Sequence, residues 1–127
     1  MAFDGPSWSI PGLVAGADLS GTGNQYRFVQ VTAARTVTRE SNAGARSIGV
    51  LYNNPAQGEA ADVRFAGVVQ VEAGGAVAAG ANIATDNVGR GVTASSNVVL
   101  GKAITAASEA GEYITIVLGA GAGDTLT

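Results

Sequence analysis

Residues 61–73 read ADVRFAGVVQVEA, and this stretch decides the fold class of the chain. Apolar or small side chains recur at every second position in it, which is the period of a β-strand with one buried face. Outward from this stretch, the chain contains further short runs rich in β-branched and aromatic residues: YRFVQVT (26–32), RTVT (35–38), SIGVLY (47–52), NIATD (82–86), RGVTAS (90–95), NVVLGKAI (97–104) and EYITIVL (112–118). Turn-forming segments such as NNPAQG and DNVGRG separate the runs. The pattern predicts an all-β fold, a small β-sandwich or barrel with little or no helix, in which only ITAASEA (104–110) could form a turn or one short helix.

Part of the sequence repeats. Residues 48–66 align with residues 100–119 when one inserted residue is allowed. Both copies have a Gly in the first strand, a Gly-Glu pair before the second strand, and three apolar residues at a spacing of two within that strand. These are Gly49 and Gly101, Gly58-Glu59 and Gly111-Glu112, and Ala61, Val63 and Phe65 with Ile114, Ile116 and Leu118. We therefore predict two similar strand–connection–strand units whose apolar rows face a shared core.

The chain of 127 residues has the length of one domain with a single core. We divide it into an extended N-terminal arm (1–24), a β-rich body (25–118) and a flexible, Gly-rich C-terminal tail (119–127). The arm contains several Gly and Pro residues and has neither strand nor helix periodicity.

The arm nevertheless carries large apolar side chains, in which a disordered linker would be depleted. They are Phe3, Trp8, Ile10, Leu13 and Val14. Two interpretations are open at this point: the arm folds back over its own barrel, or it lies on a partner.

The composition excludes many kinds of active site. The chain has no Cys and no His, which excludes disulfides, thiolate nucleophiles, Cys/His zinc sites and Ser-His-Asp triads. The Gly-rich segments GTGNQ (21–25) and GAGAGD (119–124) lack the Lys or the following helix that phosphate-binding loops require. The acidic residues lie in or beside turns. We expect no catalytic residue, no cofactor and no metal ion.

The charge and hydropathy patterns limit the partners. The net charge of −3 argues against nucleic acid, and no run approaches the ~20 apolar residues that a membrane span needs. The N-terminus does not resemble a signal peptide, so we expect synthesis in a cytoplasm. Only 13% of the residues are charged, which favours a surface partly covered by association. Four arginines lie between Arg27 and Arg46, either paired with acids of a neighbouring subunit or in ordinary solvent-facing strand positions.

Residues 26–118 closely resemble the capsid cement or decoration proteins of tailed bacteriophages. The resemblance rests on the order and spacing of several segments: the IGVL opening, the Gly-Glu turn before a strand, the AGVVQV strand, the AGANIATD segment with the Gly after it, and the closing LG, GE and YITIVL. It implies a small β-rich, β-tulip-like protein that adds to the outer surface of the virion head as a homotrimer and clamps neighbouring major capsid proteins together. It also implies a structural protein that is not an enzyme.

For such a protein, we expect the arm and two strand residues to contact the capsid. The candidate residues are Phe3, Trp8, Ile10, Leu13, Val14, Arg27 and Arg39. We expect deletion of residues 1–24 to leave a folded body that no longer decorates heads. The alternative function is a ligand-binding module of the carbohydrate-binding type, for which Trp8, Tyr26, Tyr52 and Tyr113 are the available aromatics.

Overall fold

A computed structural model of the protein describes residues 2–95, 98–119 and 124–125. Strands account for all its regular secondary structure: β1 (Ser7–Ser9), β2 (Val14–Ala15), β3 (Phe28–Ala33), β4 (Thr36–Arg39), β5 (Gly49–Leu51), β6 (Val63–Glu72), β7 (Asn82–Thr85), β8 (Gly91–Thr93), β9 (Val98–Val99), β10 (Gly101–Ala103), β11 (Tyr113–Leu118) and β12 (Asp124–Thr125). The all-β prediction is confirmed, and residues 104–110 form an irregular connection without a helix, with an isolated bridge between Ala107 and Val77. No helix long and apolar enough to cross a membrane occurs in the described part.

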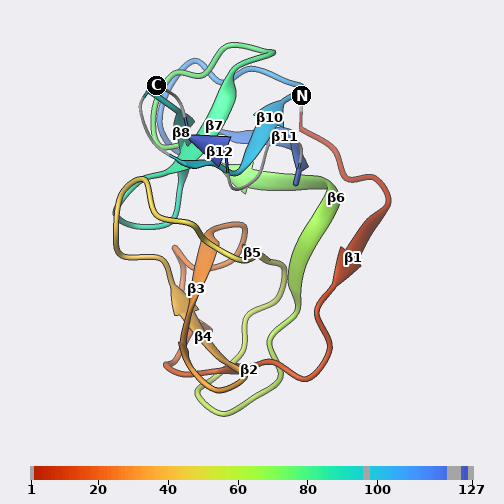
Figure 1. Ribbon diagram of the computed structural model, residues 1–127, viewed down its shortest axis with the longest axis vertical. Helices are drawn as coiled ribbons and strands as arrows, with labels where there is room; N and C mark the ends of the chain where they lie inside the picture. Colours follow the sequence, from red (N-terminus) through yellow and green to blue (C-terminus); the bar gives the residue numbers. More distant parts are fainter. Residues whose placement is uncertain (1, 96–97, 120–123, 126–127) are drawn as a thin grey trace.

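Ten strands form one mixed, mostly antiparallel sheet that bends sharply at its longest member, β6 (Figure 1). The order is β2-β4-β3-β5-β6-β11-β10-β7-β8, and β1 pairs with β6 outside this path. In the lower half of Figure 1, β2 to β5 lie beside the first part of β6, and β7, β8, β10 and β11 lie near its second part in the upper half. β6 therefore connects both halves of the molecule.

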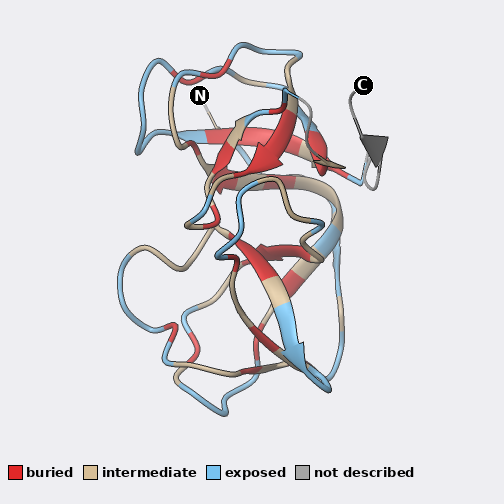
Figure 2. Cartoon of the chain, turned by 60° about the vertical axis from the view of Figure 1, so that its left-hand side comes forward, coloured by how far each residue is buried: buried red, intermediate tan, exposed pale blue. Residues whose placement is uncertain are grey.

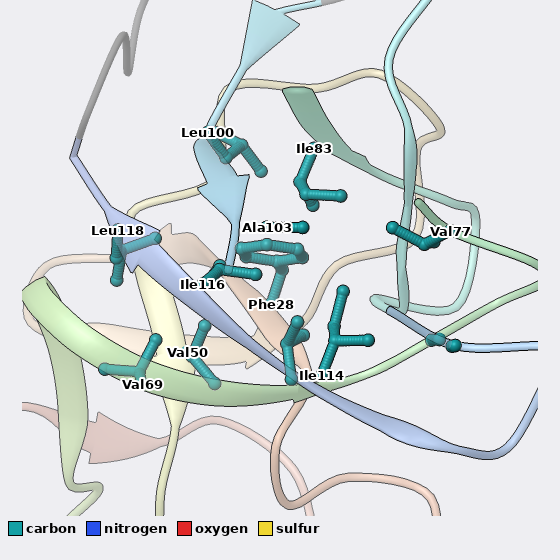
Figure 3. Close-up of a cluster of buried hydrophobic side chains, with 13 residues drawn as sticks. Phe28, Val50, Val69, Val77, Ile83, Leu100, Ala103, Ile114, Ile116 and Leu118 are labelled. Atoms are coloured by element: carbon teal, nitrogen blue, oxygen red, sulfur yellow. The ribbon is translucent and has the colours of Figure 1, made fainter. Parts of the chain in front are cut away.

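The buried side chains form two large clusters and a small third one. From the length of the chain, we expected a single core. Strands β3 and β5 explain the division, because adjacent residues on them point to opposite faces and both faces are covered. Phe28 lies in the first cluster and Val29 in the second, and neither is accessible to solvent. Figure 3 shows the first cluster, with Phe28 among Ile83, Ile114 and Ile116. The residues of β3 change from buried at the start of the strand to exposed at its end (Figure 2).

The sequence repeat corresponds to a structural repeat. β5 pairs with β6 through Val50–Arg64 and Leu51–Val63, and β10 pairs with β11 in the equivalent register through Lys102–Val117 and Ala103–Ile116. A Cβ atom on Gly49 would lie 2.3 Å from the Arg64 carbonyl oxygen, and one on Gly101 would lie 2.6 Å from that of Val117. Both glycines therefore permit the same close approach of two backbones.

The connections of the two units also match. The Glu59 carboxylate accepts a hydrogen bond from the Ala56 amide at 2.8 Å, and the Glu112 carboxylate accepts one from the Ser108 amide at 2.7 Å. These acids stabilise turns, as their position beside Gly residues indicated.

The prediction of one shared core for the two apolar rows was wrong. Ala61 and Val63 lie in the second cluster, whereas the row on β11 lies in the first. Phe65, the third member of the first row, is 45% exposed. It lies where the register between β1 and β6 shifts, and the regular alternation of β6 is interrupted there.

The N-terminal segment packs on the body of the chain. Leu13, Ala15 and Leu19 belong to the second cluster, and β2 runs parallel to β4. Of the predicted flexible tail, residues 120–123 and 126–127 lie outside the described residues; Asp124–Thr125 pairs with β9.

Candidate functional site

Residues 3–9 follow the body along β6 and β11, as Figure 1 shows for β1. The Gly5 amide donates to the Val68 carbonyl at 3.1 Å, and the Val68 amide donates to the Pro6 carbonyl at 2.9 Å. β1 then continues antiparallel to β6, with Trp8 opposite Ala66. The segment is thus held by a ladder of backbone hydrogen bonds.

The Thr115 hydroxyl anchors the start of this segment. It accepts a hydrogen bond from the Phe3 amide at 2.6 Å and donates one to the Phe3 carbonyl at 2.8 Å. Thr115 is fully buried in the middle of β11. One side chain therefore satisfies both backbone groups of Phe3.

A polar network continues the attachment. The Tyr52 hydroxyl donates to the Asp4 carboxylate at 2.7 Å and accepts from the Gln70 amide at 2.6 Å. The Arg64 guanidinium donates to the Ser7 hydroxyl at 2.6 Å and lies 4.8 Å from the centroid of the Tyr52 ring. Burial and the neighbouring Asp4 raise the pKa of the Tyr52 phenol, so it remains a donor at neutral pH. Side chains therefore fix Asp4 and Ser7 to β6 and to Tyr52, the residue after β5, in addition to the backbone ladder.

Two of the expected contact residues, Phe3 and Trp8, are exposed on this anchored segment. Phe3 is 48% exposed and Trp8 is 60% exposed. Phe65, which was not expected to be exposed, lies between the β6 residues that pair with Trp8 and Ser9. Within the described residues, no strand pairs with the outer side of β1. We call Phe3, Trp8, Phe65 and the free side of β1 the β1 edge.

The other apolar candidates of the N-terminal segment have internal positions. Leu13 is buried in the second cluster, and Ile10 packs against that cluster. Val14 is half-buried in β2, opposite Thr36 of β4. These three side chains contribute to the chain's own packing, and the β1 edge does not include them.

The two arginine candidates also make internal contacts. Arg27 forms a two-point ion pair with Glu72, at 3.3 and 3.0 Å, and donates to the Val88 carbonyl at 3.1 Å. Its side chain is only 12% exposed. Arg39 donates to the Gly23 carbonyl at 3.0 Å. Both guanidinium groups therefore hold loops in place, away from the β1 edge.

Replacement of Thr115 by Val should loosen the N-terminal anchor without changing the shape of the core. We expect Thr115→Val to lower the free energy of unfolding by about 1–2 kcal/mol, because two backbone groups of Phe3 lose their partner. Denaturant unfolding measures the loss, and amide exchange at Phe3 and Gly5 locates it. Thr93→Val, at an exposed position on β8, is the control. Equal stability and equal exchange in the two variants would contradict the anchoring role.

A second feature was not predicted from the sequence: a cleft of about 330 Å³ beside Tyr26. Ser20, Gly21, Thr22, Gly23, Gln25, Asn54, Glu72 and Tyr113 complete its lining. No local sequence pattern indicates that the side chains of Tyr26, Tyr52 and Tyr113 are in contact. Among the described residues, no group of acids could hold a metal ion.

Comparisons with known proteins agree with this architecture. A model of the phage cement protein family matches residues 22–119. The crystal structure of the head fiber gp8.5 N base in bacteriophage phi29 is similar, with a TM-score of 0.68 and 19% sequence identity over 96% of this chain and 98% of that one. This coverage includes most of the N-terminal segment, so the segment is part of the common fold. No curated protein sequence matches the chain. Because the family match spans most of the sequence, the chain belongs to the phage cement protein family, and it is a structural protein of a phage particle.

Proposed function

We propose that this chain decorates the outer surface of a phage head, where homotrimers bind the major capsid protein and stabilise the contacts between its subunits. The observation that carries this proposal is the β1 edge in a member of the cement protein family. Trp8 is 60% exposed on a strand whose outer side has no partner among the described residues. A protein with this task needs a rigid body and an adhesive surface and does not need a reactive group, so we infer that it is not an enzyme.

The chemistry of the β1 edge suits a protein partner. A free strand side offers backbone donors and acceptors to an extended segment of another chain, which would add a strand there. Exposed aromatic side chains are the residues that most often dominate protein interfaces. Because Thr115, Tyr52 and Arg64 hold the segment, little conformational entropy would be lost on binding.

A trimer would strengthen weak individual contacts. When several copies of one surface bind several capsid subunits together, avidity exceeds the affinity of a single contact by about 10²–10⁴. A modest affinity of the β1 edge on each protomer is then sufficient for stable attachment of the trimer.

Removal of the Trp8 side chain should weaken head binding without unfolding the protein. We expect Trp8→Ala to reduce affinity for heads by about 30-fold or more, because one interface hot spot of about 2 kcal/mol is lost at each contact of the trimer. Pelleting with undecorated heads at graded protein concentrations measures the change. Val31→Ala is the matched control, because Val31 is 51% exposed in the second half of β3. Binding by Trp8→Ala equal to that of Val31→Ala would exclude the β1 edge as the capsid contact.

A further inference from the structure

The cleft beside Tyr26 lies where four distant parts of the chain meet. Segment 20–25 forms one wall, and Asn54 comes from the connection between β5 and β6. Glu72 ends β6 and Tyr113 begins β11, and the two are direct cross-strand partners. At about 330 Å³, the cleft is at the small end of the range of about 300–1,000 Å³ for small-molecule sites.

The backbone at Tyr26 is strained, and two backbone hydrogen bonds hold it in this conformation. Tyr26 has φ of 63°, a conformation that a bulky residue adopts at a cost of about 1–3 kcal/mol. Its amide donates to the Leu51 carbonyl at 2.7 Å, and its carbonyl accepts from the Glu72 amide at 2.9 Å. Strain that is maintained in this way is concentrated at binding sites in proteins.

This conformation brings together the three tyrosines of the chain. The Tyr26 ring lies edge-to-face with Tyr52, at 5.2 Å between centroids, and with Tyr113, at 5.5 Å. Tyr113 remains 45% exposed at the cleft. The Tyr52 hydroxyl belongs to the Asp4 network, whereas the phenols of Tyr26 and Tyr113 have no hydrogen-bond partner within the described residues. An aromatic ring and two phenol groups are thus available to a ligand.

The polar lining is ordered before any ligand binds. The side-chain Nε2 of Gln25 donates to the Tyr52 carbonyl at 2.8 Å, and the side-chain Nδ2 of Asn54 donates to the Gln25 Oε1 at 3.2 Å. Each oxygen of the Glu72 carboxylate accepts one hydrogen bond from Arg27 and retains capacity for another. Glu72 can therefore accept from hydroxyl groups while Arg27 balances its charge.

From these features, we propose that the cleft binds one neutral sugar ring of a glycan. A sugar ring has a C–H face that packs on an aromatic ring and a rim of hydroxyls that donate to carboxylate and amide oxygens. An anionic ligand fits poorly, because Glu72 lines the cleft and its neighbour Arg27 is already engaged. An apolar ligand would leave the hydroxyl, amide and carboxylate groups of the lining unsatisfied. The lining of this site shares no residue with the β1 edge, and the proposal does not depend on the proposed capsid role.

The test is an NMR titration of the full chain, observing backbone amides, with the methyl glycosides of glucose, galactose and mannose and with N-acetylglucosamine. A glycan array with the same protein covers larger oligosaccharides. We expect saturable shifts confined to residues that line the cleft, for at least one of these sugars or for an oligosaccharide that the array identifies. Tyr113→Ala should weaken this binding by about tenfold or more, because it removes the exposed ring. Tyr113→Phe should keep most of the affinity, since the ring remains.

The controls separate binding from folding. Trp8→Ala removes an exposed aromatic outside the cleft and should leave sugar binding unchanged while it weakens head binding. Asn54→Ala removes an exposed polar group of the lining and should weaken sugar binding, which gives a second test if Tyr113→Ala unfolds. Absence of saturable cleft shifts with every sugar, or sugar affinity unchanged by both cleft variants, would overturn the proposal while leaving the capsid role untouched.

Discussion

Deletion of residues 1–20 is expected to yield a chain that no longer unfolds cooperatively, in contrast to the folded body that the sequence alone predicted after deletion of residues 1–24. The deleted segment supplies Leu13, Ala15 and Leu19 to the second core cluster, where they pack with Val29 and Val37. Full burial of one Leu side chain contributes about 1.5–3 kcal/mol, and two are removed. The deletion also removes β1 and β2 and the polar network at Asp4 and Ser7. Against a typical total stability of about 5–15 kcal/mol, this loss is large enough to unfold the chain.

Thermal unfolding followed by circular dichroism, together with the dispersion of the NMR spectrum, measures the effect of the deletion. Trp8→Ala is the control, because it truncates an exposed residue of the same segment and should melt like the intact chain. A cooperative transition of the truncated chain within a few degrees of wild type would contradict this account. The result also matters for function, because loss of head binding by an unfolded deletion variant says nothing about the contact surface.

The substitution Gly67→Ala, at the single glycine of β6, is expected to cause a large loss of stability. Gly67 has φ of +106°, and an added Cβ would lie 2.3 Å from the Pro6 carbonyl oxygen and 2.6 Å from the Ser7 Cα atom. Both contacts are with backbone, so β1 must move away from β6. We expect a loss of about 3 kcal/mol or more, from the strained φ together with the displaced strand.

Gly75→Ala is the matched control for this prediction, because a Cβ at Gly75 would meet no atom within 4 Å. Denaturant unfolding compares the two variants, and amide exchange at Ser7 and Trp8 reports whether β1 has moved. Because Trp8 belongs to the displaced strand, Gly67→Ala should also weaken head binding. Stability losses that are equal in the two variants would show that β1 does not rest on Gly67.

The sequence predicted those features that depend on local patterns. Alternation of apolar residues identified β6 and β11, whose inward side chains Val69, Val71, Ile114 and Ile116 are fully buried. The internal repeat was visible because close backbone approach leaves a recognisable Gly at Gly49 and Gly101. The resemblance to cement proteins rested on the same strands and turns, and the family match confirms it.

The features that could not be predicted depend on contacts between distant residues. The Thr115 hydroxyl binds Phe3 across 112 positions, and Arg27 pairs with Glu72 across 45. Neither residue has a local signature that distinguishes a paired side chain from a free one. The sequence around Leu13 likewise does not distinguish a side chain that contacts a partner from one that is buried in the protein's own core. The structure places Leu13 in the second cluster. The cleft at Tyr26 was missed because it requires the fold to bring four segments together.

Co-sedimentation of the wild-type protein with mature, undecorated heads of the corresponding phage tests the central claim most directly. The samples include protein without heads and the Trp8→Ala variant. The account predicts saturable pelleting at a fixed ratio to the major capsid protein, with the ratio giving the number of occupied lattice sites. Protein that is folded but remains in the supernatant at every concentration would contradict the decoration role.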